Sequence, residues 1–337
     1  MMRQAKIVFT LLALLLLISG CGTKRQYFEP EVLSGKISYD GSLPAPIHDA
    51  LRAGATLENG QVITKEGLLN VKLPQGFSYL ADNQGRYVAT SKCGALKIID
   101  ANQKELYSKE CQIAVASAAL KGNTLALVLG SNELVLIDIN DGKETMHIKQ
   151  DNVYVLDSRI AAPYFLGDLI VFPTLDGKLV IVDEQSKKPI RDIVVSNDKF
   201  FGNIIYLQVL GDRLVAATKS KVVSISPKSI SFLEKEVKDV IVLSNRIFVF
   251  TKDGQVLLTD ADLKVLKERK FPFAIFSGTI YGDYIYMIEK SGYMIASDLE
   301  LVSTNVYQMP DQIETHIYTN GDTFYYKDRF FKLNRKP

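Results

Sequence analysis

Residues 122–143 read GNTLALVLGSNELVLIDINDGK and contain the two features that decide the fold. The first is a small polar turn, Gly122-Asn123, followed by an apolar run rich in Leu, Val and Ala. The second is the run Glu133 to Asp138, an apolar stretch that ends in an aspartate. Short apolar runs bounded by Gly, Asn and Asp are typical of β-strands joined by tight turns. This stretch therefore predicts strands rather than helices.

Both features recur along the chain and stay in step. The polar turn, followed by a β run, is found at Gly85-Arg86, Gly122-Asn123, Gly167-Asp168, Gly211-Asp212, Ser244-Asn245, Gly282-Asp283 and Gly321-Asp322. Successive turns lie 33 to 45 residues apart. A strand with a polar last residue follows at Ala95 to Asp100, Glu133 to Asp138, Lys178 to Asp183, Lys221 to Ser226, Gln255 to Asp260 and Tyr293 to Asp298. Such self-similarity at a fixed period is the signature of a repeat architecture.

Each repeat has room for four short strands: one before the polar turn, one after it, the Asp-ending strand and one more. A period of about 40 residues with four antiparallel strands is typical of a propeller blade. A β-sandwich, the other all-β candidate, would not need such even spacing. We therefore expect an all-β chain with a single β-propeller domain over residues 55–337.

The seventh repeat has strands near Thr323 to Tyr326 and Arg329 to Leu333 and no room for a fourth before Pro337. An open strand edge exposes unpaired backbone groups, so a propeller has to pair it. We expect the missing strand to come from the N-terminal segment, with Leu68 to Leu73 as the nearest candidate. This predicts seven blades. Eight is the alternative if residues 55–64, with their Asn59-Gly60 hairpin turn, form most of a further blade.

The first twenty residues have the features of a signal peptide. A basic start, Arg3 and Lys6, precedes an apolar run from Ile7 to Ile18 that is shorter than the roughly 20 residues of a membrane span. Ile18-Ser19-Gly20-Cys21 resembles the lipobox of bacterial lipoproteins, which predicts cleavage before Cys21 and acylation of its thiol by fatty acid such as palmitate. Residues 21–54 would form the lipidated tether and N-terminal segment. An ordinary secretory peptide with an incidental cysteine is the alternative.

The charge balance argues against nucleic acid as a partner. The chain has 40 Lys and Arg against 38 Asp and Glu, and removal of Arg3 and Lys6 with the signal peptide leaves the mature chain neutral. Binding of phosphates requires a concentrated basic face. We therefore expect protein partners and a membrane contact through the lipid anchor.

Leu134 to Lys143, LVLIDINDGK, resembles the repeat of the quinoprotein-like (PQQ-repeat) propellers. That family includes quinone-dependent dehydrogenases and also BamB-like lipoproteins, which are non-enzymatic accessories of outer-membrane β-barrel assembly. A lipobox followed by one propeller is similar in layout to the BamB-like lipoproteins. The resemblance implies an outer-membrane lipoprotein that faces the periplasm and acts as a scaffold for another envelope protein. Gly22, next to the anchor, resembles the sorting signal of outer-membrane lipoproteins.

Two other functions stay open. One is a scaffold or ligand-binding lipoprotein of a different envelope machine. The other, and the last in order, is quinoprotein catalysis. Dehydrogenases of this fold stack their quinone on a tryptophan, and this chain has none. We therefore predict no cofactor and no enzymatic activity.

No motif in the chain indicates a metal site or a catalytic centre. The three histidines, His48, His147 and His316, are far apart and lack the spacing of metal ligands. The aspartates that recur at strand ends are interpreted as turn caps, because an Asp side chain bonds the backbone just ahead of it. These are Asp100, Asp138, Asp183, Asp260 and Asp298.

Aromatic residues near the joins between repeats are the one hint of a contact surface. They are Phe200, Phe201, Phe271 and Phe273. Packing between adjacent blades is the favoured interpretation, because large apolar side chains are more often buried than functional.

A disulfide is predicted between Cys93 and Cys111. If Asp100 pairs with Lys104 across a three-residue turn, the same offset places Cys93 directly opposite Cys111. Opposed residues of an antiparallel pair have Cα atoms about 4.5 to 5.5 Å apart, within the range of a disulfide. The oxidising periplasm permits the bond. The alternative is two free thiols in a slipped register.

Overall fold

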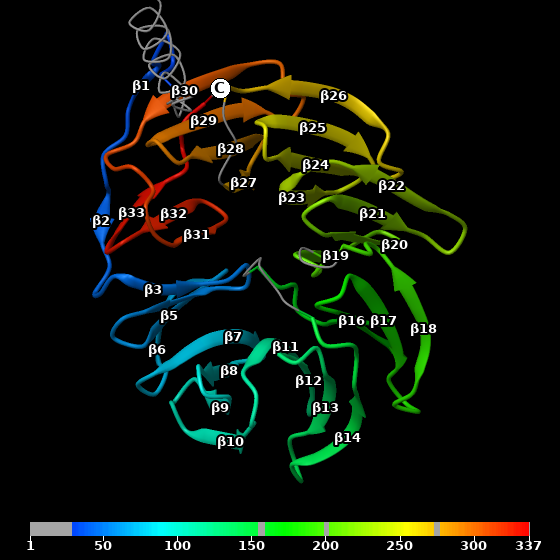
Figure 1. Cartoon of the computed structure of the whole chain (residues 1–337). Coiled ribbons are helices and arrows are strands. Elements are labelled where there is room, and N and C mark those ends of the chain that lie inside the picture. Colours follow the sequence, from blue (N-terminus) through cyan, green and yellow to red (C-terminus); the bar gives the residue numbers. More distant parts are fainter. Residues whose placement is uncertain (1–28, 154–158, 199–201, 273–276, 337) are drawn as a thin grey trace, which may run out of the picture. The chain divides into compact units, whose positions relative to one another are not determined.

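The structure is a computed structural model that describes residues 29–153, 159–198, 202–272 and 277–336. Within these ranges, all the regular secondary structure is β-strand. Contacts divide the chain into residues 1–30 and residues 31–337. The second unit is an all-β propeller of eight sheets arranged around a common centre (Figure 1). The propeller prediction is confirmed, whereas the count of seven blades is wrong and the alternative of eight is right. In these ranges no helix is long and apolar enough to cross a membrane.

The first four blades, named I to IV here, are consecutive four-stranded sheets whose strands run from the innermost to the outermost. Blade I is β3 (Ile47–Ala50), β4 (Ala55–Leu57), β5 (Gln61–Thr64) and β6 (Gly67–Lys72). Blade II is β7 (Phe77–Asn83), β8 (Arg86–Ser91), β9 (Ala95–Asp100) and β10 (Glu105–Glu110). Blade III is β11 (Val115–Lys121), β12 (Thr124–Leu129), β13 (Leu134–Asp138) and β14 (Lys143–Ile148). Blade IV is β15 (Tyr164–Leu166), β16 (Leu169–Pro173), β17 (Lys178–Asp183) and β18 (Pro189–Val194).

Blades V to VIII continue this order, and the last two take strands from the N-terminal segment. Blade V is β19 (Tyr206–Leu210), β20 (Arg213–Ala217), β21 (Lys221–Ile225) and β22 (Ile230–Glu234). Blade VI is β23 (Val237–Leu243), β24 (Arg246–Thr251), β25 (Gln255–Asp260) and β26 (Val265–Lys270). Blade VII is β27 (Ser277–Tyr281), β28 (Tyr284–Glu289), β29 (Tyr293–Asp298), β30 (Thr304–Gln308) and β1 (Gly35–Lys36). Blade VIII is β31 (Ile317–Asn320), β32 (Thr323–Tyr326), β33 (Arg329–Lys332) and β2 (Gly41–Ser42).

The N-terminal segment closes the ring, as expected, but with a different strand from the one predicted. β2 pairs antiparallel with β33 and completes blade VIII. Leu68 to Leu73, the predicted closing strand, lies in and just after β6, the outermost strand of blade I. β1 adds a fifth, parallel strand to blade VII. Strand pairing therefore begins at Gly35, ahead of the predicted domain start at residue 55.

The core consists of eight apolar layers, one between each pair of successive blades. Strand β12 shows why the second and third strands read as unbroken apolar runs. Its Leu125 and Leu127 side chains pack toward blade II, whereas Ala126 and Val128 pack toward blade IV. Successive side chains of a strand point to opposite faces, and here both faces are covered by a neighbouring blade.

The recurring polar turns join the first two strands of seven blades. Six of them have glycine with positive φ, for example 55° at Gly122, which glycine adopts without steric cost. The seventh, Ser244, holds a φ of 51°. This backbone requirement explains why the turn was visible as a sequence repeat.

Candidate functional site

Most of the residues predicted as an anchor or a contact surface lie outside the described ranges. This applies to Cys21, Phe200, Phe201 and Phe273. Phe271 is described: it is buried and belongs to the apolar layer between blades VI and VII. Phe271 therefore packs between blades.

The register of the Cys93 and Cys111 hairpin differs from the predicted one. Glu105 pairs with Ile99 as expected, but a bulge before Tyr107 shifts the rest of β10 by one residue. The Cys111 amide donates to the Gly94 carbonyl at 3.0 Å, so Cys111 lies opposite Gly94 rather than Cys93. Both thiols are free in this structure. The predicted direct opposition is wrong, and the disulfide stays a prediction that thiol counting on the denatured, unreduced chain would test.

The recurring aspartates cap turns, as interpreted from the sequence. Asp298 is the fullest case: its carboxylate accepts hydrogen bonds from the amides of Glu300, Val302 and Ser303 at 2.9, 3.1 and 2.6 Å. Burial acts to raise the pKa of Asp298, but these backbone donors outweigh it, and the pKa lies below its usual value. The equivalent carboxylates also accept from amides just ahead of them; they are Asp100, Asp138, Asp183 and Asp260.

The histidines stay apart, as their spacing indicated. His48 and His316 are exposed. His147 contacts two carboxylates on blade III, with Nε2 2.6 Å from Glu133 and Nδ1 3.3 Å from Glu144. Within the described ranges, no group of three or more His, Cys, Asp or Glu side chains is placed to hold a metal ion.

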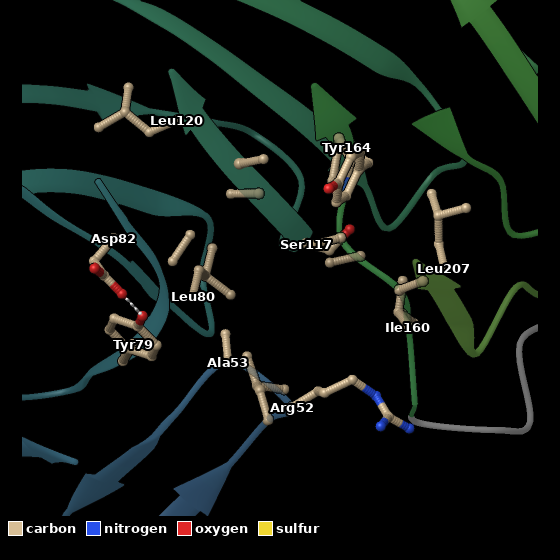
Figure 2. A pocket seen from close by; sticks show the side chains of 18 of the residues that line it. Arg52, Ala53, Tyr79, Leu80, Asp82, Ser117, Leu120, Ile160, Tyr164 and Leu207 are labelled. Carbon is tan, nitrogen blue, oxygen red and sulfur yellow. Dashed lines mark hydrogen bonds between the residues drawn. The ribbon is translucent and has the colours of Figure 1, made fainter. Parts of the chain in front are cut away.

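A cavity of about 520 Å³ lies at the inner ends of blades I to V (Figure 2). Its wall comes from the β3–β4 and β5–β6 turns, from strands β7 and β11, and from residues 160–164 and 205–207. Binding pockets for small molecules generally measure about 300 to 1,000 Å³. The volume is therefore sufficient for a ligand.

The cavity exists because many of the side chains that line it are small and apolar. Seven alanines line it, together with leucines and isoleucines from four blades and the turns of blade I. Alanines at the inner ends of converging strands leave space that larger residues would fill. The charged members of the wall are Arg52, Lys65, Glu66 and Asp82. They comprise two of each sign, so the wall carries no formal net charge.

Arg52 connects three blades through the centre of the ring. It lies in the turn between β3 and β4 of blade I, and its guanidinium forms an ion pair with Asp239 on β23 of blade VI. The Arg52 Cζ atom also lies 4.6 Å from the centre of the Tyr206 ring on β19 of blade V. Partial desolvation acts to lower the pKa of Arg52, but Asp239 and Tyr206 more than offset this, so the pKa is raised and the side chain stays charged.

Two tyrosines are held in the cavity wall by burial and hydrogen bonding. The Tyr79 hydroxyl donates a hydrogen bond to the Asp82 carboxylate on the same strand (Figure 2). Burial, and after it this hydrogen bond, raises the pKa of Tyr79. Burial likewise raises the pKa of Tyr206, and the nearby Arg52 only partly opposes the shift. Both phenols therefore stay neutral at physiological pH.

The outer strands of three successive blades expose large apolar side chains, which we call the rim residues. They are Ile190 and Val194 on β18, Ile230 and Phe232 on β22, and Val265 and Leu266 on β26. Ile190 is 58% exposed, Phe232 52% and Leu266 51%. Single exposed apolar residues are ordinary, but each of these three outer strands exposes two, whereas β6 and β10 expose one each, Leu68 and Leu106. This difference favours the rim residues as a contact surface.

Neither the cavity nor the rim was found from the sequence. Ala, Ser and Arg occur throughout the chain, and the residues of the cavity wall become neighbours only when five blades meet. For the rim the sequence offers only a weak indication, which is the alternation along Ile230–Glu234, where exposed and part-buried residues alternate in the structure. Such alternation also occurs in any strand with one face buried, so it does not identify a contact surface.

Comparison with curated proteins gives two relatives. The plasminogen-binding protein PgbB of Helicobacter pylori strain J99 is 30% identical over 95% of this chain and 70% of its own length. PgbB of strain 26695 is 29% identical over 95% of this chain and 69% of its own length. No family model matches the chain.

Comparison with solved structures shows the fold. BamB from Moraxella catarrhalis superposes with a TM-score of 0.66 at 16% identity, covering 89% of this chain and 99% of BamB. The C-terminal WD40 domain of Sif2 has the same TM-score at 12% identity, covering 89% and 99%. The expected BamB-like propeller fold is thus confirmed. At these identities the likeness extends to the fold alone.

Proposed function

This chain belongs to the family of the plasminogen-binding protein PgbB of Helicobacter pylori, and from that membership we propose that it is a non-catalytic, lipid-anchored propeller that binds plasminogen. The 30% identity over 95% of the chain carries the proposal. The lipobox-like segment ending at Cys21 supports the anchor, since acylation there would hold the propeller at a membrane. Plasminogen binding requires that the propeller face the outside of the cell.

The rim residues are the part of the propeller that best fits a protein partner. Protein interfaces are enriched in large apolar and aromatic side chains at their centres. Phe232 is half-exposed, with the Lys221 ammonium 5.4 Å from its ring centre. The Lys221 ammonium also pairs with Glu234 at 3.1 Å, so the Phe232 ring can bury area against a partner while that charge keeps its counter-ion.

Surface plasmon resonance with immobilised plasminogen tests the function. We expect saturable binding by the full chain. The double variant Ile230→Ser/Phe232→Ser should bind at least about tenfold more weakly, since loss of a central apolar anchor commonly costs more than 1 kcal/mol. The matched control is Leu68→Ser/Leu106→Ser, which changes two similarly exposed leucines on blades I and II. Absence of binding by the unchanged chain would refute the function, whereas equal loss in both double variants would refute the rim as its site.

A BamB-like role in outer-membrane β-barrel assembly is the second candidate, and its support is the shared fold. It would place the propeller in the periplasm, where plasminogen has no access. Proteinase K added to intact cells separates the two: degradation of the propeller supports plasminogen binding, and protection supports a periplasmic scaffold. Recovery of a β-barrel assembly protein with the purified chain would then favour assembly over another envelope machine.

A further inference from the structure

Ser117 has an unused hydroxyl in the wall of the central cavity. The residue lies on β11 directly after a bulge at Val115/Ser117 and is only 5% exposed. Across the described chain, its Oγ atom finds no hydrogen-bond partner. A buried hydroxyl without a partner costs about 1 to 3 kcal/mol. Such a cost is removed when a ligand supplies the missing hydrogen bond.

The charged groups of the wall are either engaged or exposed. Arg52 is paired with Asp239, and Asp82 accepts a hydrogen bond from the Tyr79 hydroxyl. Lys65 and Glu66, in the β5–β6 turn, are exposed to solvent. The wall has no formal net charge, and most of it is Ala, Leu and Ile. An anion would have to displace Asp239 from Arg52, and any ion that entered between the apolar side chains would lose its hydration. The cavity therefore suits an apolar body rather than a charged one.

We propose that this cavity binds an uncharged, mainly apolar small molecule that carries one hydrogen-bonding group for the Ser117 hydroxyl. The apolar body would pack against the alanines of β11 and against the side chains of Leu80, Ile160 and Leu207. Figure 2 labels these last three residues in the cavity wall. Ser117 would fix its orientation, since a hydroxyl both donates and accepts. The inference is independent of plasminogen binding, because the rim residues lie on other strands.

Fluorescence titration with N-phenyl-1-naphthylamine tests the proposal. This probe is uncharged, has an apolar aromatic body and one N–H group, and brightens in apolar surroundings. The full chain carrying Cys21→Ser is used, so that no acyl chain competes for the probe. We expect saturable binding with one site. The anionic analogue 8-anilinonaphthalene-1-sulfonate, of similar skeleton, should bind at least about tenfold more weakly because its sulfonate must be desolvated.

Two variants locate the probe. Ala119→Leu fills the cavity from β11 and should abolish binding, whereas Ala101→Leu in the exposed β9–β10 turn should leave it unchanged. Ser117→Ala should weaken binding about fivefold, the equivalent of one hydrogen bond. It should not lower the unfolding temperature, because the hydroxyl has no partner to lose. No saturable binding, equal binding of the sulfonate, or binding unchanged in Ala119→Leu would overturn the proposal.

Discussion

Arg52 joins blades that are not neighbours, and no local pattern in the sequence indicates this. Its partners Asp239 and Tyr206 lie 187 and 154 residues further along the chain. The Asp239 side chain is 14% exposed, whereas that of Arg52 is 53% exposed. The pair is therefore intermediate between a surface salt bridge and a buried one, and its loss would leave Asp239 largely buried without its cation.

Arg52→Ala should lower the free energy of unfolding by about 1 to 2 kcal/mol, more than a surface pair is worth and less than a fully buried one. The matched control is Arg246→Ala, which breaks an ion pair with Glu300 whose side chains are 34% and 55% exposed. That change should cost under about 1 kcal/mol. Urea denaturation measures both. Equal costs would mean that the central connection contributes no more than an ordinary surface pair.

Side chains that serve their own turn were predictable from the sequence. The aspartate caps were predictable because Asp298 and its equivalents bond amides two to five residues ahead. The pairing of Cys93 with Cys111 was predicted wrongly because a single bulged residue in β10 changes the register, and no residue type in Glu105–Glu110 indicates that bulge. Ser117 and Arg52 were missed because their surroundings come from distant blades.

At the scale of strands, the N-terminal segment works as a clasp across two blades. β1 covers the outer edge of β30, and β2 covers β33, with the Asp40 amide donating to the Phe330 carbonyl at 2.9 Å. The Asp40 carboxylate accepts the Lys332 amide at 2.7 Å. Tyr39 adds a hydrogen bond of 2.9 Å to Asp311. The need for such a strand was predictable from the incomplete last repeat, but its two-residue length gave no strand signal.

Deletion of residues 34–42 should therefore destabilise the propeller by about 3 kcal/mol or more. It removes both clasp strands, opens two strand edges and uncovers the apolar side chains beneath them. Deletion of residues 22–30, of equal length but outside the propeller unit, should leave the free energy of unfolding unchanged. Urea denaturation followed by circular dichroism compares the two. Similar stability of both deletions would show that the clasp is dispensable.

At the scale of the whole molecule, the repeat determined the architecture but not the number of blades. Seven blades carry the polar turn, whereas blade I reverses through Leu51–Gly54 and its third strand ends at Thr64 instead of an aspartate. A blade without these sequence features can be identified only by the neighbouring blades that pack against it. Ala55, Leu57 and Ile63 pack against Tyr318 and Tyr325 of blade VIII, and Val62 and Val71 pack against Tyr79 and Tyr87 of blade II. Packing against blades VIII and II thus stabilises blade I, although its sequence lacks the polar turn and the terminal aspartate of the other blades.

Because of the tyrosines buried between its blades, the propeller should lose free energy of unfolding at alkaline pH. Burial raises the pKa of Tyr79, Tyr206 and Tyr318 above the ordinary value. A phenol whose pKa is higher in the folded chain than in the unfolded one favours folding at low pH. That contribution is complete below about pH 10, where unfolded tyrosine ionises, and it is lost as the pH rises beyond.

Tyrosine ionisation followed at 295 nm should consequently occur in two steps. The chain has 16 tyrosines and no tryptophan, so the absorbance change reports tyrosinate without interference. Exposed phenols should ionise first, and the buried set should ionise only together with the loss of the β-sheet circular dichroism signal, because a phenolate cannot be accommodated in an apolar layer. Tyr79→Phe should reduce the amplitude of the second step alone. A single smooth titration that is complete while the sheet signal persists would contradict this account, since the buried phenols would then be ionising inside the folded propeller.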